Sequence, residues 1–227
     1  MVEVFENVWI VIPCYNEQAV IGKTVNDVLA AFKNVVVVDD CSTDRSADIA
    51  FKAGAHLCRH PVNLGQGASL STGISYALQQ GATAIVTFDA DGQHNADDAR
   101  ALVRALFAND VDVVLASRFL GSTKGMTISK SLVLRLATIF TRVTTGLRLT
   151  DTHNGLRAFK ASAARKIDIK QNRMAHASEI LHEISSKNLR YQEAPCCILY
   201  TDYSRHKGQK MSGMVDILKD LFVAKLN

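Results

Sequence analysis

The sequence predicts an α/β fold with a mostly parallel central sheet and helices on both faces. Through the first half of the chain, short β-branched runs alternate with helical patterns, which is typical of βαβ units. Residues 35–38 are apolar at four successive positions, as expected for a strand covered on both faces. Polar residues follow several of these runs, and open parallel sheets bind ligands at the carboxyl ends of their strands. The sequence therefore predicts one shared ligand crevice.

The predicted elements follow one another without a Pro- or Ser-rich linker. In chain order they are strand 8–13, helix 17–32, strand 34–40, helix 42–54, strand 54–60, helix 67–81, strand 82–91, helix 95–110 and strand 111–118. The remainder is less regular. We expect a single domain over residues 1–227, with a regular half at 1–118, a more irregular half at 119–212 and a C-terminal amphipathic helix at 213–227.

Composition excludes several classes of protein. The 227 residues are 48% apolar, and a net charge of +4 is too small to indicate nucleic acid as a partner. Five cysteines without a C-x-x-C pair predict reduced thiols and a cytoplasmic location. Cys196 and Cys197 are better interpreted as small strand residues than as a metal pair. Glu3 and Glu6 interrupt any leader-like apolar region, and no run reaches the ~18 apolar residues of a membrane-spanning helix.

Two carboxylates lie one residue apart in "FDADGQH", directly after an apolar strand. Asp89 and Asp91 repel each other at this range, and a divalent cation would remove that repulsion. Mg²⁺ and Mn²⁺ accept carboxylate oxygens together with substrate phosphates, and Gln93 is a further oxygen ligand nearby. Asp-x-Asp alone is common, but its place at a strand end, with acidic residues at another strand end, makes a metal site the preferred interpretation.

Other polar residues allow structural alternatives. Asn16 and the run Ser42–Asp44 can cap helices, which for Ser42–Asp44 is the preferred interpretation. Residues 63–67 form a glycine-containing loop before a helix, where the helix N-terminus could face an anion or the loop could be a structural turn. No G-x-G-x-x-G follows the first strand and no G-x-x-x-x-G-K-[ST] occurs, which argues against a dinucleotide dehydrogenase and a P-loop NTPase.

An ordered set of motifs resembles the family 2 glycosyltransferases, above all the polyprenyl-phosphate hexosyltransferase branch that includes dolichol-phosphate-mannose synthases. The motifs are "VIPCYNE", "VVVVDDCSTDRS", "NLGQGASLSTGI", "FDADGQH", "ASR", "DTHNGLRAF" and "YSRHKGQKMS", and they cover residues 8–212. The resemblance implies a GT-A fold with a Rossmann-like sheet, a nucleotide-binding half at 1–118 and an acceptor-side half at 119–212. It also implies a nucleotide-diphospho-sugar donor, Mg²⁺ or Mn²⁺, and inversion at the anomeric carbon.

The resemblance assigns roles to individual residues. The implied nucleotide-sugar ligands are Pro13, Tyr15, Glu17, Asp39, Asp40, Asn63, Gly67, Asp89, Ala90, Asp91, Arg118, Arg205 and Lys207. The implied metal ligands are Asp89, Asp91 and Gln93. Arg205 and Gly208 match a mobile loop over the pyrophosphate, and the positive charges of Arg205, Lys207 and Lys210 can neutralise the leaving group.

The acceptor decides whether a general base is needed. A phosphate acceptor is already ionised, whereas a hydroxyl acceptor would need a base, for which Asp151 or Glu179 is available. His176, Glu179 and His182 share a helix face, but the metal site implied by the resemblance lies elsewhere.

Two departures from the family pattern bear on the substrates. Gln66 stands where a Lys is common, and Lys130 stands where the lipid-phosphate branch usually has Arg. Lys can hold a phosphate as a point charge but not as a bidentate fork.

The function predicted is metal-dependent transfer of a hexose or N-acetylhexosamine, from a UDP- or GDP-sugar to a polyprenyl-phosphate or lipid-linked saccharide, in cell-envelope glycan assembly. The alternatives are a sugar-1-phosphate nucleotidyltransferase, which would need a Gly-rich basic loop after the first strand, and a non-catalytic membrane-associated adaptor. A homodimer is compatible with the sequence.

A peripheral membrane contact is predicted for residues 123–149. Seven apolar residues recur there at close to helical spacing, namely Ile128, Leu132, Leu136, Ile139, Phe140, Val143 and Leu147. Five basic residues accompany them without an acid before Asp151. A basic amphipathic helix of this kind can lie in an anionic membrane interface. The alternative is a core or dimer helix.

Overall fold

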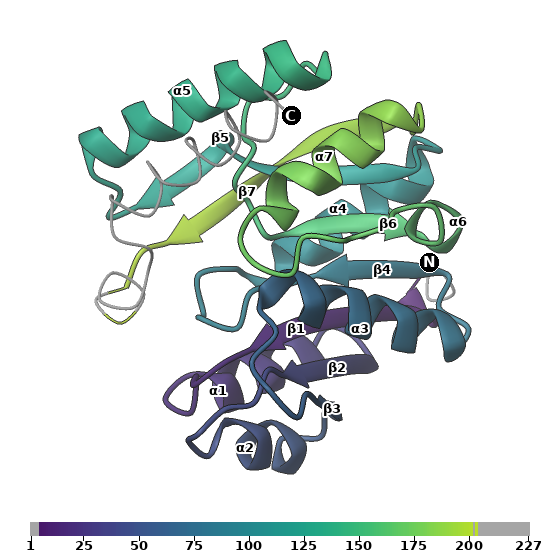
Figure 1. The fold of residues 1–227 in the computed structure, drawn as a ribbon, viewed down its shortest axis with the longest axis vertical. Helices are drawn as coiled ribbons and strands as arrows, with labels where there is room; N and C mark the ends of the chain where they lie inside the picture. Colours follow the sequence, from purple (N-terminus) through teal and green to yellow (C-terminus); the bar gives the residue numbers. More distant parts are fainter. Residues whose placement is uncertain (1–4, 202, 204–227) are drawn as a thin grey trace.

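The computed structural model describes residues 5–201 and 203, whose strands form one sheet with helices on both sides (Figure 1). The strands are β1 (Val8–Cys14), β2 (Asn34–Asp39), β3 (His56–Arg59), β4 (Ala84–Thr87), β5 (Val113–Lys124), β6 (Arg157–Lys160) and β7 (Tyr191–Leu199). The helices are α1 (Ile21–Leu29), α2 (Ser46–Lys52), α3 (Gln66–Gln79), α4 (Ala96–Ala108), α5 (Ile128–Thr145), α6 (Ala161–Ala164) and α7 (His176–Ser186).

The sheet has the strand order β3-β2-β1-β4-β6-β5-β7. β1 pairs in parallel with β2 and β4, β2 with β3, and β5 with β7, so the predicted mostly parallel sheet is confirmed. β6 runs antiparallel to both of its neighbours, β4 and β5. The boundary expected at residue 118 falls inside β5, and the strands of the less regular half, β6 and β7, belong to the same sheet.

Two apolar cores cover the two faces of the sheet. Residues 35–38 of β2 are at most 1% exposed, which confirms the strand buried on both faces. One core contains apolar side chains of α1, α2 and α4, and the other those of α3, α6 and α7. α5 lies at the edge of the molecule and buries only Leu134, Ala137, Thr138 and Thr141 (Figure 1).

The expected helices are present in the structure, but their bounds differ from the expected ones. The helix expected at 17–32 is α1, which begins only at Ile21, because Glu17 lies in a turn whose carbonyl accepts the Ile21 N–H. The N-cap position of α2 is Arg45, which makes no side-chain cap hydrogen bond, while the carboxylate of the preceding Asp44 accepts the N–H of Ser46, the first residue of α2. The helix predicted within 123–149 is α5. Among the residues that the structure describes, no helix is long and apolar enough to cross a bilayer.

α3 packs very closely on the sheet through a glycine. A Cβ on Gly73 would lie 2.3 Å from Val11 Cγ1 of β1 and 3.1 Å from Val38 Cγ2 of β2. Gln66, Ser69 and Leu70 of this helix line the ligand crevice, so the contact at Gly73 sets the depth at which they lie.

We predict that Gly73→Ala destabilises the protein although Ala favours helices. Overpacking a core of this kind costs about 1–3 kcal/mol, and urea unfolding would show the loss. Ser75→Ala, at an exposed position of the same helix, is the control and should not destabilise. Val11→Ala added to Gly73→Ala should recover part of the loss. A Gly73→Ala variant as stable as the wild type would mean that α3 is free to shift.

Candidate functional site

A cavity of about 410 Å³ opens at the carboxyl ends of β1, β2, β4 and β5, as the sequence predicted. Nine of the predicted ligand-binding and metal residues line it, namely Pro13, Tyr15, Glu17, Asp40, Asp89, Ala90, Asp91, Gln93 and Arg118. They come from the ends of four strands that are separated in sequence. The parallel arrangement of β1, β2 and β4 brings three of these ends to one edge of the sheet, and β5 contributes the fourth.

Asp40 anchors the glycine-containing loop before α3. Its carboxylate accepts the backbone N–H groups of Leu64 at 2.9 Å and Gly65 at 2.7 Å, and it lies 2.7 Å from Nδ1 of His60. His60 in turn reaches Thr72 on α3 with Nε2, at 2.9 Å. Asp40 therefore has a structural task in addition to lining the cavity.

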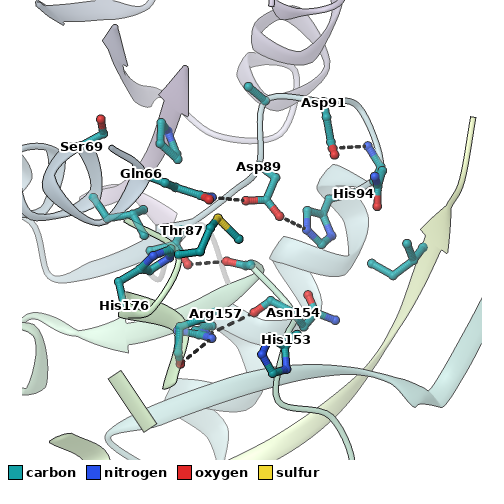
Figure 2. Close-up of a pocket in the computed structure, with 18 of the residues that line it drawn as sticks. Gln66, Ser69, Thr87, Asp89, Asp91, His94, His153, Asn154, Arg157 and His176 are labelled. Carbon is teal, nitrogen blue, oxygen red and sulfur yellow. Dashed lines mark hydrogen bonds and ion pairs between the residues drawn. The ribbon is translucent and has the colours of Figure 1, made fainter. Parts of the chain in front are cut away.

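The two carboxylates after β4 differ in their surroundings. Asp89 accepts hydrogen bonds from Nε2 of Gln66 at 3.1 Å and from Nε2 of His94 at 3.0 Å (Figure 2). Burial tends to raise the pKa of Asp89, but the hydrogen bond and charge of His94 outweigh it and leave the pKa lowered. For Asp91, burial and then the negative charge of Asp89 raise the pKa to about 6. Asp91 is thus the carboxylate whose charge is least compensated, which suits a cation.

Arg118 lies in a bulge of β5 and is held by a buried ion pair. Register with β7 shifts between Ser117 and Ser122. Nε of Arg118 lies 2.6 Å from Asp151 Oδ2, Nη1 donates to the Tyr200 hydroxyl at 2.8 Å, and Nη2 donates to the His153 carbonyl. Burial tends to lower the pKa of Arg118, but the charges and hydrogen bonds of Asp151 and Tyr200 together outweigh it and raise the pKa. Arg118 is therefore a fixed positive charge in the cavity wall.

A second cation, Lys130 of the first turn of α5, lies beside Arg118. Its Nζ lies 4.3 Å from the centre of the Tyr200 ring, and the residue lines the cavity. Burial, and then the charge of Arg118, lower the pKa of Lys130. Because the two positive charges disfavour each other, an anion bound beside them would be stabilised.

Three basic side chains form the floor of the cavity near β6 and α7: His153, Arg157 and His176 (Figure 2). Arg157 donates to the carbonyls of Asn154 and Ala177, and burial lowers its pKa to about 10. Burial lowers the pKa of both histidines to about 4, so both are neutral at pH 7. Neutral imidazoles can donate or accept hydrogen bonds, which suits an uncharged polar ligand group.

Three residues predicted to bind the donor, Asp39, Asn63 and Gly67, do not line the cavity. Asp39 is fully buried, where it accepts the N–H of Ser42 and pairs with Arg59 at 3.3 Å. Asn63 is exposed and donates to the Asp40 carbonyl.

Gly67 supports the structural-turn interpretation of its loop. Its N–H donates to the Asn172 carbonyl at 2.8 Å, and a Cβ there would lie 2.0 Å from the Gln171 carbonyl oxygen. Its N–H is therefore engaged within the protein, as is that of Ala68, which favours the structural-turn alternative over the anion site.

Neither predicted general base reaches the cavity. Asp151 is 3% exposed behind Arg118. Glu179 accepts the backbone N–H groups of Lys170 and Gln171 at 3.1 and 2.9 Å, so it holds the loop before α7. The structure therefore corrects both assignments. Within residues 5–201 and 203, no group of three His, Cys, Asp or Glu side chains could hold a metal, so the helix face of His176, Glu179 and His182 is not a metal site.

The predicted residues Arg205 and Lys207, and the helix expected at 213–227, lie outside the described residues. The last described residue, Tyr203, donates its hydroxyl to Glu17 Oε2 at 2.7 Å and so brings the end of the described chain to the β1 end of the cavity.

Sequence reasoning gave no role to three further lining residues, His94, His153 and Tyr200. His94 could have been found, because it follows the acidic pair within the same short turn. His153 lies inside the matched motif "DTHNGLRAF". Tyr200 has no comparable signal, because only the parallel pairing of β5 and β7 brings it to Arg118.

Comparison with known proteins agrees with this geometry. The family model described as Glycosyl transferase family 2 matches residues 9–168. The chain is 35% identical to the uncharacterized protein MJ1222 of Methanocaldococcus jannaschii, covering 97% of this chain and 93% of that protein. It is 28% identical to the UDP-N-acetylglucosamine–dolichyl-phosphate N-acetylglucosaminyltransferase of Methanococcus voltae, covering 96% of each. It is 30% identical to the undecaprenyl-phosphate mannosyltransferase of Micrococcus luteus, covering 70% of this chain and 68% of that one.

Solved structures confirm the fold. A glucosyl-3-phosphoglycerate synthase from Mycobacterium tuberculosis, crystallised with Mn²⁺ and UDP-glucose, superposes with a TM-score of 0.73 at 17% identity, covering 99% of this chain and 81% of that one. The predicted GT-A fold is therefore confirmed.

We predict unequal stability effects for the two carboxylates that were expected to be bases. Asp151→Asn leaves Arg118 buried without its counter-charge, which costs about 3 kcal/mol or more. Glu179→Gln keeps an oxygen that can accept the same backbone N–H groups and should cost less than about 1 kcal/mol. Urea unfolding of both variants checks this. An Asp151→Asn protein that unfolds at the wild-type urea concentration would contradict the structural role.

Proposed function

The chain belongs to glycosyl transferase family 2, and we propose that it transfers a hexose or N-acetylhexosamine from a UDP- or GDP-sugar to a polyprenyl phosphate or lipid-linked saccharide. The transfer inverts the anomeric carbon and serves cell-envelope glycan assembly. One observation carries the proposal: a single cavity combines the acidic pair Asp89 and Asp91 with the cations Arg118 and Lys130. The acidic residues suit a metal-bound donor, and the cations suit a phosphate acceptor.

The placement of the carboxylates favours a phosphate acceptor over a hydroxyl. A phosphate is already ionised and needs no base, whereas a hydroxyl must lose a proton. Among the described residues, the carboxylates that line the cavity are Glu17, Asp40, Asp89 and Asp91. The first three accept hydrogen bonds from Tyr203, from the Leu64–Gly65 backbone, and from Gln66 and His94. Asp91 is the preferred metal ligand. The names of the dolichyl- and undecaprenyl-phosphate relatives support the same acceptor class.

Arg118 and Lys130 would orient the acceptor phosphate. Arg118 is immobilised by Asp151 and Tyr200, so its charge needs no rearrangement when an anion arrives. Lys130 contributes a point charge on a longer and more mobile side chain. An anion between them would relieve their mutual repulsion, and the phosphate oxygen would then be held within the same cavity as the donor.

The residues present fit a divalent cation. Asp91 is buried beside another carboxylate, which raises its pKa to about 6, and Gln93 lines the same part of the cavity. Asp89, Asp91 and Gln93 would hold Mg²⁺ or Mn²⁺ through the hard oxygen ligands that these ions prefer. When bound, the ion would supply positive charge for the diphosphate group of the nucleoside diphosphate that leaves the sugar.

We expect Asp91→Asn to weaken nucleotide binding in the presence of Mn²⁺ and to lower turnover by about a hundredfold, since an amide lacks the anionic charge that the cation needs. Calorimetry with UDP and with GDP, each with Mn²⁺, measures the first effect. Nucleoside diphosphate released from the corresponding sugars in the presence of a polyprenyl phosphate measures the second. Asp97→Asn, an exposed acid on α4, is the matched control. Unchanged affinity and turnover in Asp91→Asn would rule out the metal assignment.

We propose further that α5 rests on the membrane that carries the acceptor. Five apolar side chains on this helix are more than half exposed: Ile128 90%, Leu132 59%, Leu136 55%, Ile139 55% and Val143 77%. Their spacing of three or four residues puts them along one side of the helix. Lys130 of the same helix lines the cavity. Because Lys130 is two residues from Ile128 and from Leu132, it lies on the opposite side of the helix from them. A helix whose apolar side rested on the bilayer would therefore hold the cavity directly behind it, close to the membrane surface.

The protein should pellet with liposomes that contain phosphatidylglycerol at low salt and be released at high salt, because the basic residues of α5 are attracted to anionic lipid. Leu132→Gln combined with Leu136→Gln should weaken partitioning at least about tenfold, since each leucine loses about 1.5–3 kcal/mol of burial. Phe51→Gln removes an apolar side chain of α2 that is 66% exposed, and serves as the control. A wild-type protein that stays in the supernatant at low salt contradicts this proposal.

A further inference from the structure

Both oxygens of the Asp89 carboxylate are held by side chains from other parts of the chain. Gln66, the first residue of α3, donates from Nε2 to Oδ1 at 3.1 Å. His94, in the turn before α4, lies with Nε2 3.0 Å from Oδ2. Figure 2 shows the carboxylate between these two side chains. A carboxylate that is held on both oxygens keeps one orientation before any ligand arrives.

We propose that Gln66 and His94 are positioning residues, which fix Asp89 in the orientation that the metal-bound nucleotide requires. This inference rests on the proposed function. Second-sphere side chains that orient a ligand commonly change metal affinity or activity by about 10–100-fold when they are replaced. Neither residue needs to touch the metal or the nucleotide for this effect.

The His94 side chain makes few polar contacts apart from that with Asp89. Its side chain is 3% exposed, and the ring stands edge-on to Phe88 with the ring centres 5.6 Å apart. Nδ1 is buried and has no hydrogen-bond partner among the described residues. Burying an imidazole with one nitrogen unpaired is unfavourable, and Phe would fill the same space without that penalty. The contact with Asp89 is therefore the polar interaction that distinguishes His94 from an apolar core residue.

The backbone at Gly155 also restricts rotation of the Asp89 carboxylate. A Cβ on Gly155 would lie 2.2 Å from Asp89 Oδ2, so the carboxylate packs directly on this glycine. The Thr87 hydroxyl donates to the Gly155 carbonyl at 2.6 Å and fixes that backbone relative to β4. Among the described residues, Asp91 by contrast accepts a hydrogen bond only from the Gln93 N–H within its own turn, at 3.0 Å. One carboxylate is thus fixed in advance, and the other lies on the turn itself.

The amide at position 66 holds Asp89 without neutralising it. A lysine there would donate a hydrogen bond and also add a positive charge beside the acidic pair, which would weaken the attraction for a divalent cation. Gln66 supplies the geometry alone. This distinction separates positioning from charge in an experiment, because Gln and Glu have nearly the same shape.

The test compares Gln66→Leu, Gln66→Glu and His94→Phe with the wild type. Calorimetry measures Mn²⁺ affinity in the presence of UDP and of GDP, and steady-state kinetics measures kcat and KM. Positioning predicts about 10–100-fold weaker Mn²⁺ binding in all three variants. If only charge mattered, Gln66→Glu would instead bind Mn²⁺ more tightly. Gln79→Leu, an exposed glutamine at the end of α3, is the control and should bind as the wild type does.

The outcomes separate this inference from the proposed function. If the wild type binds no Mn²⁺ with either nucleotide, the proposed function fails. If the wild type binds but Gln66→Leu and Gln66→Glu bind equally well or better, the positioning inference is overturned while the proposed function stands. Thermal unfolding of each variant without metal checks that it folds. Should His94→Phe fail to fold, the two Gln66 variants still decide.

Discussion

The repulsion between two carboxylates at the buried end of β4 is the constraint around which the cavity is arranged. Asp89 and Asp91 are separated by one residue, and the negative charge of Asp89 contributes to raising the pKa of Asp91. The protein compensates the negative charges of these two carboxylates to different extents. Asp89 receives hydrogen bonds from α3 and from the turn before α4, whereas Asp91 keeps a charge that a cation can neutralise. A site of this kind is poised for a divalent ion because the protein has left part of the charge uncompensated.

A second pair of buried charges, Arg118 and Asp151, lies at the opposite wall of the cavity. Arg118 and Asp151 meet because β6 enters the sheet antiparallel between β4 and β5, which brings the loop before β6 to the carboxyl ends of its neighbours. The same loop supplies Gly155 against Asp89 and the carbonyls that bind Arg118 and Arg157. One segment therefore contacts both the acidic and the basic walls. A shift in this loop would alter the two walls together, which couples the donor and acceptor ends of the cavity.

The sequence predicted the parts of the site that depend on local pattern. Strand ends can be located in the sequence because parallel strands buried on both faces are continuous apolar runs. The residues at these ends, Asp40, Asp89, Asp91 and Arg118, could therefore be assigned to one crevice. The side chains of Asp151 and Glu179 could not be placed in this way. The partner of Asp151 is 33 residues away along the chain, and the partners of Glu179 are 8 and 9 residues away. Only the fold decides whether such a carboxylate faces a cavity, an arginine or a loop. The antiparallel β6 was missed because four residues carry too little pattern.

The position of α5 links the chemistry to the acceptor's physical state. A polyprenyl phosphate cannot leave the bilayer at low cost, because each buried CH₂ contributes about 0.8 kcal/mol. An enzyme with such an acceptor must therefore bring its cavity to the membrane surface. Lys130 lies in the cavity, while Leu132 and Leu136, only two and six residues further along the helix, are more than half exposed. One side of this helix thus carries a positive charge that lines the cavity, and the opposite side carries the apolar surface that is proposed to rest on the bilayer. That arrangement is the physical reason to propose a lipid-linked acceptor rather than a soluble sugar.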